Sequence, residues 1–127
     1  MIDPAIVGKR ITSSTHFTVN QDAITRFCQA ISERDDSVAP PTFSFTFIFA
    51  AFEETLKGAG VDWSRMVHGD QRFEIREPIK AGDKLSISST VESVRSAAGN
   101  ELVTVRADIE REGQEIIHAW STLVVRG

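Results

Sequence analysis

The spacing of hydrophobic and polar positions changes about halfway along the chain. In the first half, residues 21–32 carry apolar side chains at intervals of three and four. Four of them share one face of a helix: Ile24, Phe27, Cys28 and Ile31. This spacing predicts an amphipathic helix. Asn20 is a suitable N-cap residue, and Asp22 lies in the first turn, where the helix dipole favours a negative charge.

The next apolar segment follows Pro41 and admits two interpretations. Phenylalanine occupies every second position from 43 to 49, as in a strand. A second set of apolar residues shares a helical face: Phe45, Ile48, Phe49, Phe52 and Leu56. The stretch runs for about sixteen residues, longer than most strands. Thr42 can cap its start and Gly58 can end it. We therefore expect a helix over about residues 42–57, buried nearly all round because phenylalanines lie on more than one side.

The second half of the chain alternates with a period of two, which predicts strands. The stretches at 96–100 ("SAAGN") and 111–114 ("REGQ") indicate tight turns between them, and short turns imply an antiparallel sheet. One strand shows the pattern clearly, with an apolar face (Val103, Val105, Ala107 and Ile109) and a polar face (Thr104, Arg106, Asp108 and Glu110). The apolar face needs a cover, and the phenylalanine-rich helix is the only segment apolar enough. The expected fold class is α+β: a hotdog fold, in which an antiparallel sheet wraps around a long buried helix, in a single domain over residues 1–127.

Composition narrows the function classes. The chain has 127 residues, a net charge of −4 and no basic stripe, so nucleic acid is not an expected partner. The single cysteine allows no internal disulfide, which fits a reducing compartment, and we expect a cytoplasmic protein without a signal peptide. The longest apolar run, 47–52, is too short to cross a membrane. The three histidines are far apart in sequence, and we expect neither a metal nor a cofactor.

Several stretches together resemble the MaoC-like hotdog hydratases and dehydratases. They are "GKRITSSTHFTVNQDAITRFCQAI", "APPTF", "HGDQRFEIREPIKAGDKL" and "IIHAWSTLVV". The chain looks most like the N-terminal half of the two-hotdog (R)-specific enoyl-CoA hydratases, and like the substrate-binding subunit of (R)-hydroxyacyl-ACP dehydratase. The resemblance implies reversible hydration of a trans-2-enoyl thioester to an (R)-3-hydroxyacyl thioester. This chemistry needs an acid/base pair near one water and a donor for the thioester oxygen.

The chain departs from the family pattern where the acid/base pair belongs. The family supplies an Asp and a His in a D-x-N-P-x-H loop before the buried helix. Here the loop reads "SERDDSVAPPTF": Asp35 and Asp36 are present, but no Asn-Pro and no histidine follow. Two adjacent acids after a helix are more often a solvated turn. The N-terminal halves of the two-hotdog enzymes also lack the pair and hold the acyl-CoA, so the resemblance favours a substrate-binding role.

Two groups of residues are candidates for a site. His68 and Asp70 correspond to the family's His-Gly-Glu-Gln run, and residues two apart point the same way in a strand. They are candidate catalytic residues, and their alternative role is hydrogen bonding at a sheet edge. Thr42, Phe43, Phe47 and Gln71 are candidate substrate-binding residues, because a helix start offers free N–H groups and phenylalanines can line an acyl channel. His118 and Cys28 are expected to be structural.

Three functions stay open at this point. The chain is a substrate-binding subunit that acts with a second hotdog chain, a self-sufficient homodimeric hydratase that uses His68 and Asp70, or an acyl thioesterase or acyl-thioester binding module. In each case the expected ligand is an acyl thioester of CoA or acyl carrier protein. A lone hotdog domain also leaves an edge strand exposed, so we expect a homodimer or a heterodimer.

Overall fold

The computed structural model of the chain describes residues 1–13 and 16–127. Its largest element is an antiparallel sheet in the order β1–β4–β5–β6–β3, with β2 paired to the start of β4. The strands are β1 (Arg10–Thr12), β2 (Phe17–Thr18), β3 (Met66–Ile75), β4 (Lys84–Ala97), β5 (Asn100–Arg111) and β6 (Gln114–Val125). The helices are α1 (Gln21–Ala30) and α2 (Phe45–Thr55), with short 3₁₀ turns η1 (Pro4–Ile6) and η2 (Trp63–Arg65).

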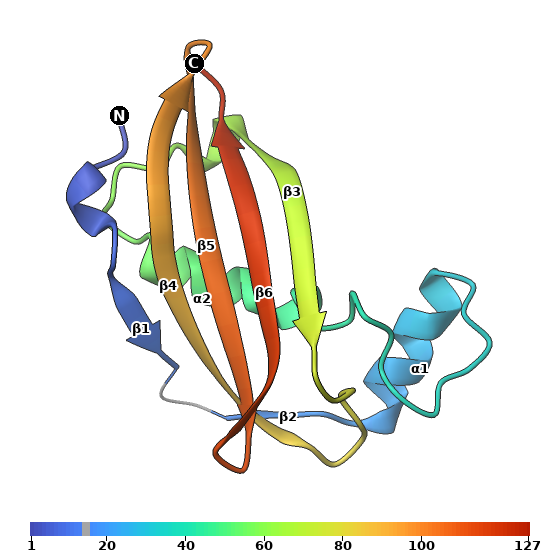
Figure 1. Cartoon of the computed structure of the whole chain (residues 1–127). Coiled ribbons are helices and arrows are strands. Elements are labelled where there is room, and N and C mark those ends of the chain that lie inside the picture. The colour runs from blue at the N-terminus through green and yellow to red at the C-terminus, as the bar shows by residue number, and fades with distance from the viewer. Residues whose placement is uncertain (14–15) are drawn as a thin grey trace.

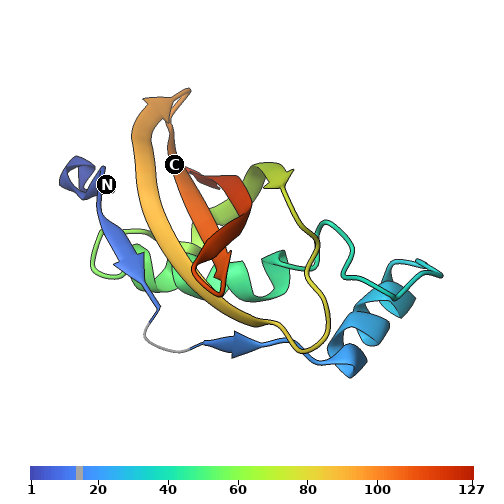
Figure 2. The ribbon, with the colours of Figure 1, turned by 60° about the horizontal axis from the view of Figure 1, so that its bottom comes forward.

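The sheet curves around α2, which lies across its concave face (Figures 1 and 2). This arrangement is the hotdog architecture, so the predicted fold class is confirmed. The core lies between the helix and the sheet. It includes Ile48, Phe52 and Leu56 from the helix side and Leu85, Val91, Val105 and Ile109 from the strands. Ala107 and Ala119, both fully buried, face the helix from the middle strands and leave room for its close approach.

The helix that the sequence predicts over residues 42–57 forms over residues 45–55. Residues 41–44 form turns instead, and Thr42 is not the N-cap. The N-cap is Ser44, whose buried hydroxyl makes no capping hydrogen bond. The predicted stop is close to correct, because the helix ends before Leu56 and Gly58 takes a left-handed conformation with φ 77°.

The expectation that this helix is buried nearly all round is wrong. Phe47, Ile48 and Phe52 are buried, but Thr46, Ala50 and Glu53 are exposed and Phe45 and Phe49 are only half-buried. The reason is that one sheet covers only one side of a helix. Glutamates on the remaining side keep their hydration, and nothing else in residues 1–13 and 16–127 covers it.

The first predicted helix is confirmed as α1, although it ends at Ala30. Asn20 caps it as expected, because its Oδ1 accepts a hydrogen bond from the Ala23 N–H at 2.7 Å. Ile31 is half exposed, since it lies beyond the last turn and does not belong to the buried face. The helix stands beside the sheet (Figure 1) and contacts the turn before α2, where the Phe27 and Phe43 rings meet edge to face at 5.6 Å.

Both predicted turns form hairpins. Ala98–Gly99 and Glu112–Gly113 connect β4 to β5 and β5 to β6, and all four residues have positive φ, as two-residue hairpins of this kind require. The polar face of the sheet is less exposed to solvent than the alternation predicts. Asp108 lies on that face and is only 3% exposed.

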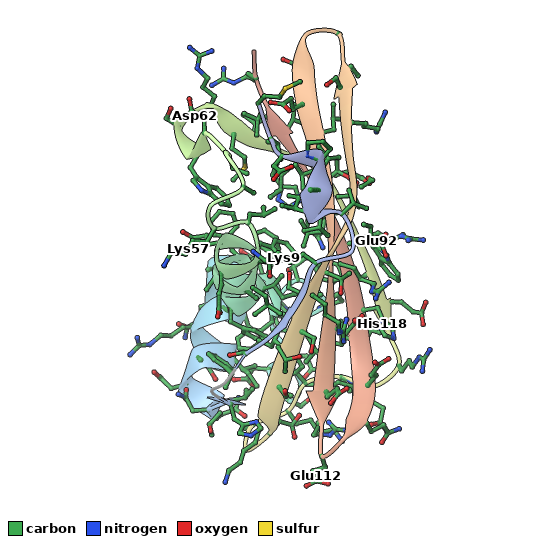
Figure 3. The ribbon with its side chains drawn as sticks, turned by 90° about the vertical axis from the view of Figure 1, so that its left-hand side faces the viewer. Lys9, Lys57, Asp62, Glu92, Glu112 and His118 are labelled. Carbon is green, nitrogen blue, oxygen red and sulfur yellow. The ribbon has the colours of Figure 1, made fainter. Side chains whose placement is uncertain are left out.

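Asp108 is buried because cationic side chains surround its carboxylate. Its Oδ2 accepts from Arg10 Nη1 at 2.6 Å, and its Oδ1 accepts from Arg106 Nε at 3.0 Å and contacts His118 Nδ1 at 2.6 Å. Glu92 joins the cluster through Arg106 at 2.8 Å. Figure 3 shows Glu92 and His118 on the face of the sheet turned away from α2. We call this group the outer-face network. It connects β1, β4, β5 and β6.

Candidate functional site

A cavity of about 380 Å³ lies between α1, the start of α2 and β3. We call it the edge cavity, because β3 is the last strand of the sheet. Its walls are largely aromatic and the surface that faces the cavity is apolar, although polar residues from the turn before α2, from α2 and from β3 are among those that line it. The lining residues are Phe27, Thr42, Phe45, Thr46, His68, Gln71 and Phe73. The fold therefore brings together three residues that the sequence proposed for a site: Thr42, His68 and Gln71.

His68 and Asp70 do not share a face, so the geometric basis for pairing their side chains is wrong. The register between β3 and β6 shifts at this point: His68 lies opposite Leu123, Asp70 lies opposite Thr122, and Gly69 has no partner. This β-bulge reverses the alternation. His68 and Gln71 therefore face the helix, while Asp70 faces outward with Thr122.

Gly69 makes the bulge possible. A Cβ atom at this position would lie 2.8 Å from Cγ2 of Val124 and 3.3 Å from the carbonyl oxygen of Thr122. The first distance is shorter than real contacts allow, so any other residue would require the Val124 side chain or the strand to shift. Gly69 thus lets the strand place His68 and Gln71 on one side.

The His68 ring is held from two directions. It lies 5.0 Å from the Phe45 ring, and its Nε2 is 2.9 Å from the carbonyl oxygen of Asp70. A carbonyl can only accept, so Nε2 carries the proton and Nδ1 of the neutral ring remains an acceptor. The His68 side chain is exposed. Asp70 contacts it through its backbone carbonyl oxygen and not through its side-chain carboxylate.

Gln71 is fixed by a residue 50 positions away in the sequence. The hydroxyl of Ser121, fully buried on β6, donates a hydrogen bond to Gln71 Oε1. This bond orients the amide at the wall of the cavity, and leaves Nε2 with only a weak contact to the Arg72 carbonyl at 3.4 Å. The sequence suggested Gln71 but had no signal for Ser121, because only the register brings them together.

The start of α2 offers N–H groups, but not at Phe43. The N–H groups of Phe43, Phe45, Thr46 and Phe47 each donate to the carbonyl three residues earlier. Within residues 1–13 and 16–127, the N–H groups of Thr42 and Ser44 donate to no backbone carbonyl. Phe43 itself is buried against Phe27 and does not line the edge cavity. Ser44 is buried as well and does not line the edge cavity, so the candidate donor for a substrate oxygen is Thr42.

A second cavity, of about 410 Å³, lies on the other side of α2 against β1, β2 and β4. We call it the rear cavity. Phe47 lines it and stacks on Phe17, with ring centroids 4.4 Å apart. Thr46, on the exposed side of α2, is the residue that the two lining sets share. Phe47 thus lines the rear cavity, whereas His68 and Gln71 line the edge cavity.

Asp35 and Asp36 serve the loop after α1. Asp35 accepts from the N–H and hydroxyl of Ser37 at 3.0 and 2.6 Å, and these bonds hold the pKa of the Asp35 carboxyl below its ordinary value. Asp36 accepts from the Thr25 hydroxyl at 2.7 Å. Neither residue lines the edge cavity.

His118 and Cys28, which the sequence analysis expected to be structural, lie away from the edge cavity. His118 is half-buried between Asp108 and Glu115 in the outer-face network. Cys28 is buried, and burial together with the nearby charges of Asp36 and Glu33 raises the pKa of its thiol, which disfavours the reactive thiolate. Within residues 1–13 and 16–127, no group of His, Cys, Asp or Glu side chains could hold a metal ion, and no helix is long and apolar enough to cross a membrane.

Comparison with known structures defines the class. The fold matches a MaoC-like dehydratase with a TM-score of 0.89 at 24% identity, covering 96% of this chain and 42% of that one. It also matches the HadBC complex, a (3R)-hydroxyacyl-ACP dehydratase from Mycobacterium tuberculosis, with a TM-score of 0.77 at 25% identity over 94% and 96% of the two chains. The protein is a hotdog domain of the MaoC-like dehydratase type.

Sequence comparison names the family. The model of the FAS1-like dehydratase domain region matches residues 5–119, and the chain belongs to this family. Among its relatives, a UPF0336 protein of Streptomyces coelicolor is 32% identical, over 98% of this chain and 95% of its own length. The predicted resemblance to MaoC-like hotdog dehydratases is therefore confirmed.

Proposed function

We propose that the chain is the substrate-binding component of an (R)-specific enoyl-thioester hydratase or 3-hydroxyacyl-thioester dehydratase, and that its 127 residues act as one hotdog unit. The observation that carries the proposal is the edge cavity, an apolar pocket with aromatic walls that has Thr42, His68 and Gln71 among its lining residues. This combination suits a ligand with a polar head and an apolar tail.

The polar groups match the head of an acyl thioester. A thioester carbonyl accepts hydrogen bonds, and within residues 1–13 and 16–127 the N–H group of Thr42 before α2 donates to no backbone carbonyl. The 3-hydroxyl of a hydroxyacyl group can donate, and Nδ1 of His68 is an acceptor. The phenylalanines of the cavity offer an apolar surface to the first carbons of the acyl chain. In the hydration reaction, donors at the carbonyl oxygen stabilise the negative charge that develops there.

The proposal assigns proton transfer to a second hotdog chain. Hydration needs one group that activates water and one that protonates carbon. Among the described residues, His68 is the only titratable side chain that lines the edge cavity, and the bulge turns the Asp70 carboxylate away from it. The loop between α1 and α2 also lacks the D-x-N-P-x-H motif. The register thus argues against a self-sufficient hydratase that uses His68 and Asp70 together. Known assemblies of this fold include the HadBC and ChsH1–ChsH2 complexes.

The test combines binding with turnover. Titration of the wild-type chain with crotonyl-CoA and longer enoyl-CoAs in a calorimeter should show binding, while the enoyl absorbance stays constant. His68→Ala and Gln71→Ala should each weaken binding about fivefold to tenfold, the equivalent of about 1–1.4 kcal/mol. Gln114→Ala, at the exposed start of β6, is the matched control and should bind like the wild type.

Each alternative predicts a different result. Loss of enoyl absorbance with the pure chain would overturn the binding-only role in favour of a self-sufficient hydratase. Release of free thiol would indicate a thioesterase. Absence of binding at millimolar enoyl-CoA and with acyl carrier protein thioesters would reject the proposal. Addition of a MaoC-like chain that carries D-x-N-P-x-H should increase turnover above that of the added chain alone.

A further inference from the structure

The walls of the edge cavity are built from side chains that carry rings. Phe27 of α1, Phe45 of α2 and Phe73 of β3 line it, and His68 adds a fourth ring. The remaining lining residues are Thr42, Thr46 and Gln71, so no leucine, isoleucine, valine or methionine is among the described residues that line it. An occupant of the edge cavity therefore meets aromatic surface on several sides.

The three phenylalanine rings are not used up by one another. Each of them is half-buried. The Phe27 ring meets Phe43 edge to face at 5.6 Å, and the Phe45 ring lies 5.0 Å from the ring of His68. Within residues 1–13 and 16–127, the Phe73 ring contacts no other ring. A flat ring in the cavity would therefore find aromatic neighbours that are still open to contact.

The rear cavity has a similar volume but a different wall. Its two phenylalanines, Phe17 and Phe47, already stack on each other at 4.4 Å. Much of its remaining apolar wall is aliphatic and consists of Ile11, Ala50, Ala51 and Ile87. The two cavities thus differ in the chemistry of their walls more than in size, and an aromatic wall is a property of the edge cavity.

Aromatic rings pack against other rings edge to face or offset, and gain from this geometry beyond the area that they bury. We propose that the acyl group in the edge cavity carries an aromatic ring, so that the substrates are 3-aryl-enoyl and 3-aryl-3-hydroxyacyl thioesters. The inference rests on the proposed function, which places the first acyl carbons against these phenylalanines. A ring attached to C3 then lies among Phe27, Phe45 and Phe73.

The cavity is large enough for such a group. An apolar cavity of about 150 Å³ can hold benzene. The edge cavity has about 380 Å³, which leaves room for the three acyl carbons beside the ring. The surface that faces the cavity is apolar, so an unsubstituted ring loses no hydrogen bond when it enters.

A matched pair of ligands separates aromatic recognition from burial of apolar surface. 3-Phenylpropanoyl-CoA and 3-cyclohexylpropanoyl-CoA have the same number of carbons and the same thioester, and neither carries the enoyl double bond. The cyclohexyl group is at least as apolar as phenyl, so burial alone predicts no preference for phenyl. In calorimetric titrations of the full chain, we expect a dissociation constant about fivefold lower for the phenyl ligand, the equivalent of about 1 kcal/mol.

Leucine variants test whether the preference comes from these rings. Phe45→Leu and Phe73→Leu each remove one ring from the wall and keep an apolar side chain. Each should reduce the preference for phenyl to within about twofold, because the cyclohexyl ligand loses no ring contact. Phe17→Leu is the matched control, since Phe17 is also half-buried but lines the rear cavity, and it should keep the wild-type preference. A preference that survives in both edge-cavity variants would overturn the assignment.

The remaining outcomes separate this inference from the proposed function. Tighter or equal binding of the cyclohexyl ligand would overturn the aromatic substrate class and leave the substrate-binding role in place. Tighter binding of nonanoyl-CoA, which has the same number of acyl carbons, would do the same and assign a linear chain to the site. Absence of binding by all three ligands, by crotonyl-CoA and by acyl carrier protein thioesters would reject both the inference and the proposed function.

Discussion

Replacement of Asp108 by asparagine tests the outer-face network most directly. The carboxylate is buried, and three cationic or protonatable groups reach it from β1, β5 and β6. The Asp108→Asn change keeps the shape of the side chain but removes the negative charge that Arg10 and Arg106 share. We expect the folded state to lose stability because these arginines then lie beside a neutral, buried amide.

The expected loss of stability in Asp108→Asn depends on how exposed Arg10 and Arg106 are. Removing one partner of a buried ion pair typically costs about 3–5 kcal/mol. The Arg10 and Arg106 side chains, however, keep 39% and 32% of their surface in water. They can recover hydration, so we reduce the expected loss to about 2–3 kcal/mol. Urea denaturation at fixed protein concentration should show a midpoint lower by about 1–2 M with an unchanged slope.

The pH dependence gives a second signature. Burial alone would raise the pKa of the Asp108 carboxyl, but hydrogen bonds from Arg10 and His118 and the charge of Arg106 together lower it. A folded pKa below the unfolded value, about 3.9, contributes stability above that pH, and this contribution is lost as pH falls through the folded pKa. The difference between wild type and Asp108→Asn should therefore be constant above about pH 5 and shrink below about pH 4.

Glu92→Gln is the matched control for Asp108→Asn. Its carboxylate belongs to the same network but is a third exposed, so its loss should cost less than about 1 kcal/mol. If Asp108→Asn were within about 0.5 kcal/mol of the wild type, or if its deficit did not shrink at low pH, the assignment of Asp108 as the centre of the network would be wrong.

Three further predictions concern the packing of the core and the site. Phe52→Ala should cost about 3–5 kcal/mol in urea denaturation, because Phe52 is fully buried between helix and sheet; a cost below about 1.5 kcal/mol would contradict that placement. Gly69→Ala should cost about 1–3 kcal/mol through its clash with Val124. Val124→Ala should offset part of this cost, and additive effects in the double-mutant cycle would exclude a direct contact. Ser121→Ala should weaken enoyl-CoA binding no more than Gln71→Ala, because the hydroxyl acts only through Gln71; a larger loss would show an independent role.

The spacing of apolar residues along the chain was enough to predict both helices and the long strands. The spacing of three and four in 21–32, the apolar run before Gly58 and the alternation after residue 71 depend on neighbours within a few positions. Those elements formed close to their expected bounds. Strands β1 and β2 carried no such signal, because at three and two residues they are too short for a period to show. Their pairing with β4 defines them.

The candidate site depended on tertiary structure more heavily. The sequence identified the His-Gly-Asp-Gln run, but period-two alternation placed His68 and Asp70 together. The bulge at Gly69 joined His68 to Gln71 instead. A bulge arises from the fit between two strands that lie far apart in the sequence, and alternation along one strand contains no trace of it.

The amino-acid sequence by itself determined the two helices and the long strands, the apolar faces of the strands, and that the chain lacks the D-x-N-P-x-H loop of its family. Only the tertiary structure decided that Thr42, His68 and Gln71 share a cavity, that Ser121 orients Gln71, and that Asp108 is buried. The physical reason is range: periodicity and capping act between near neighbours, whereas a cavity, a bulge or an ion cluster needs groups that only chain folding brings within a few ångströms.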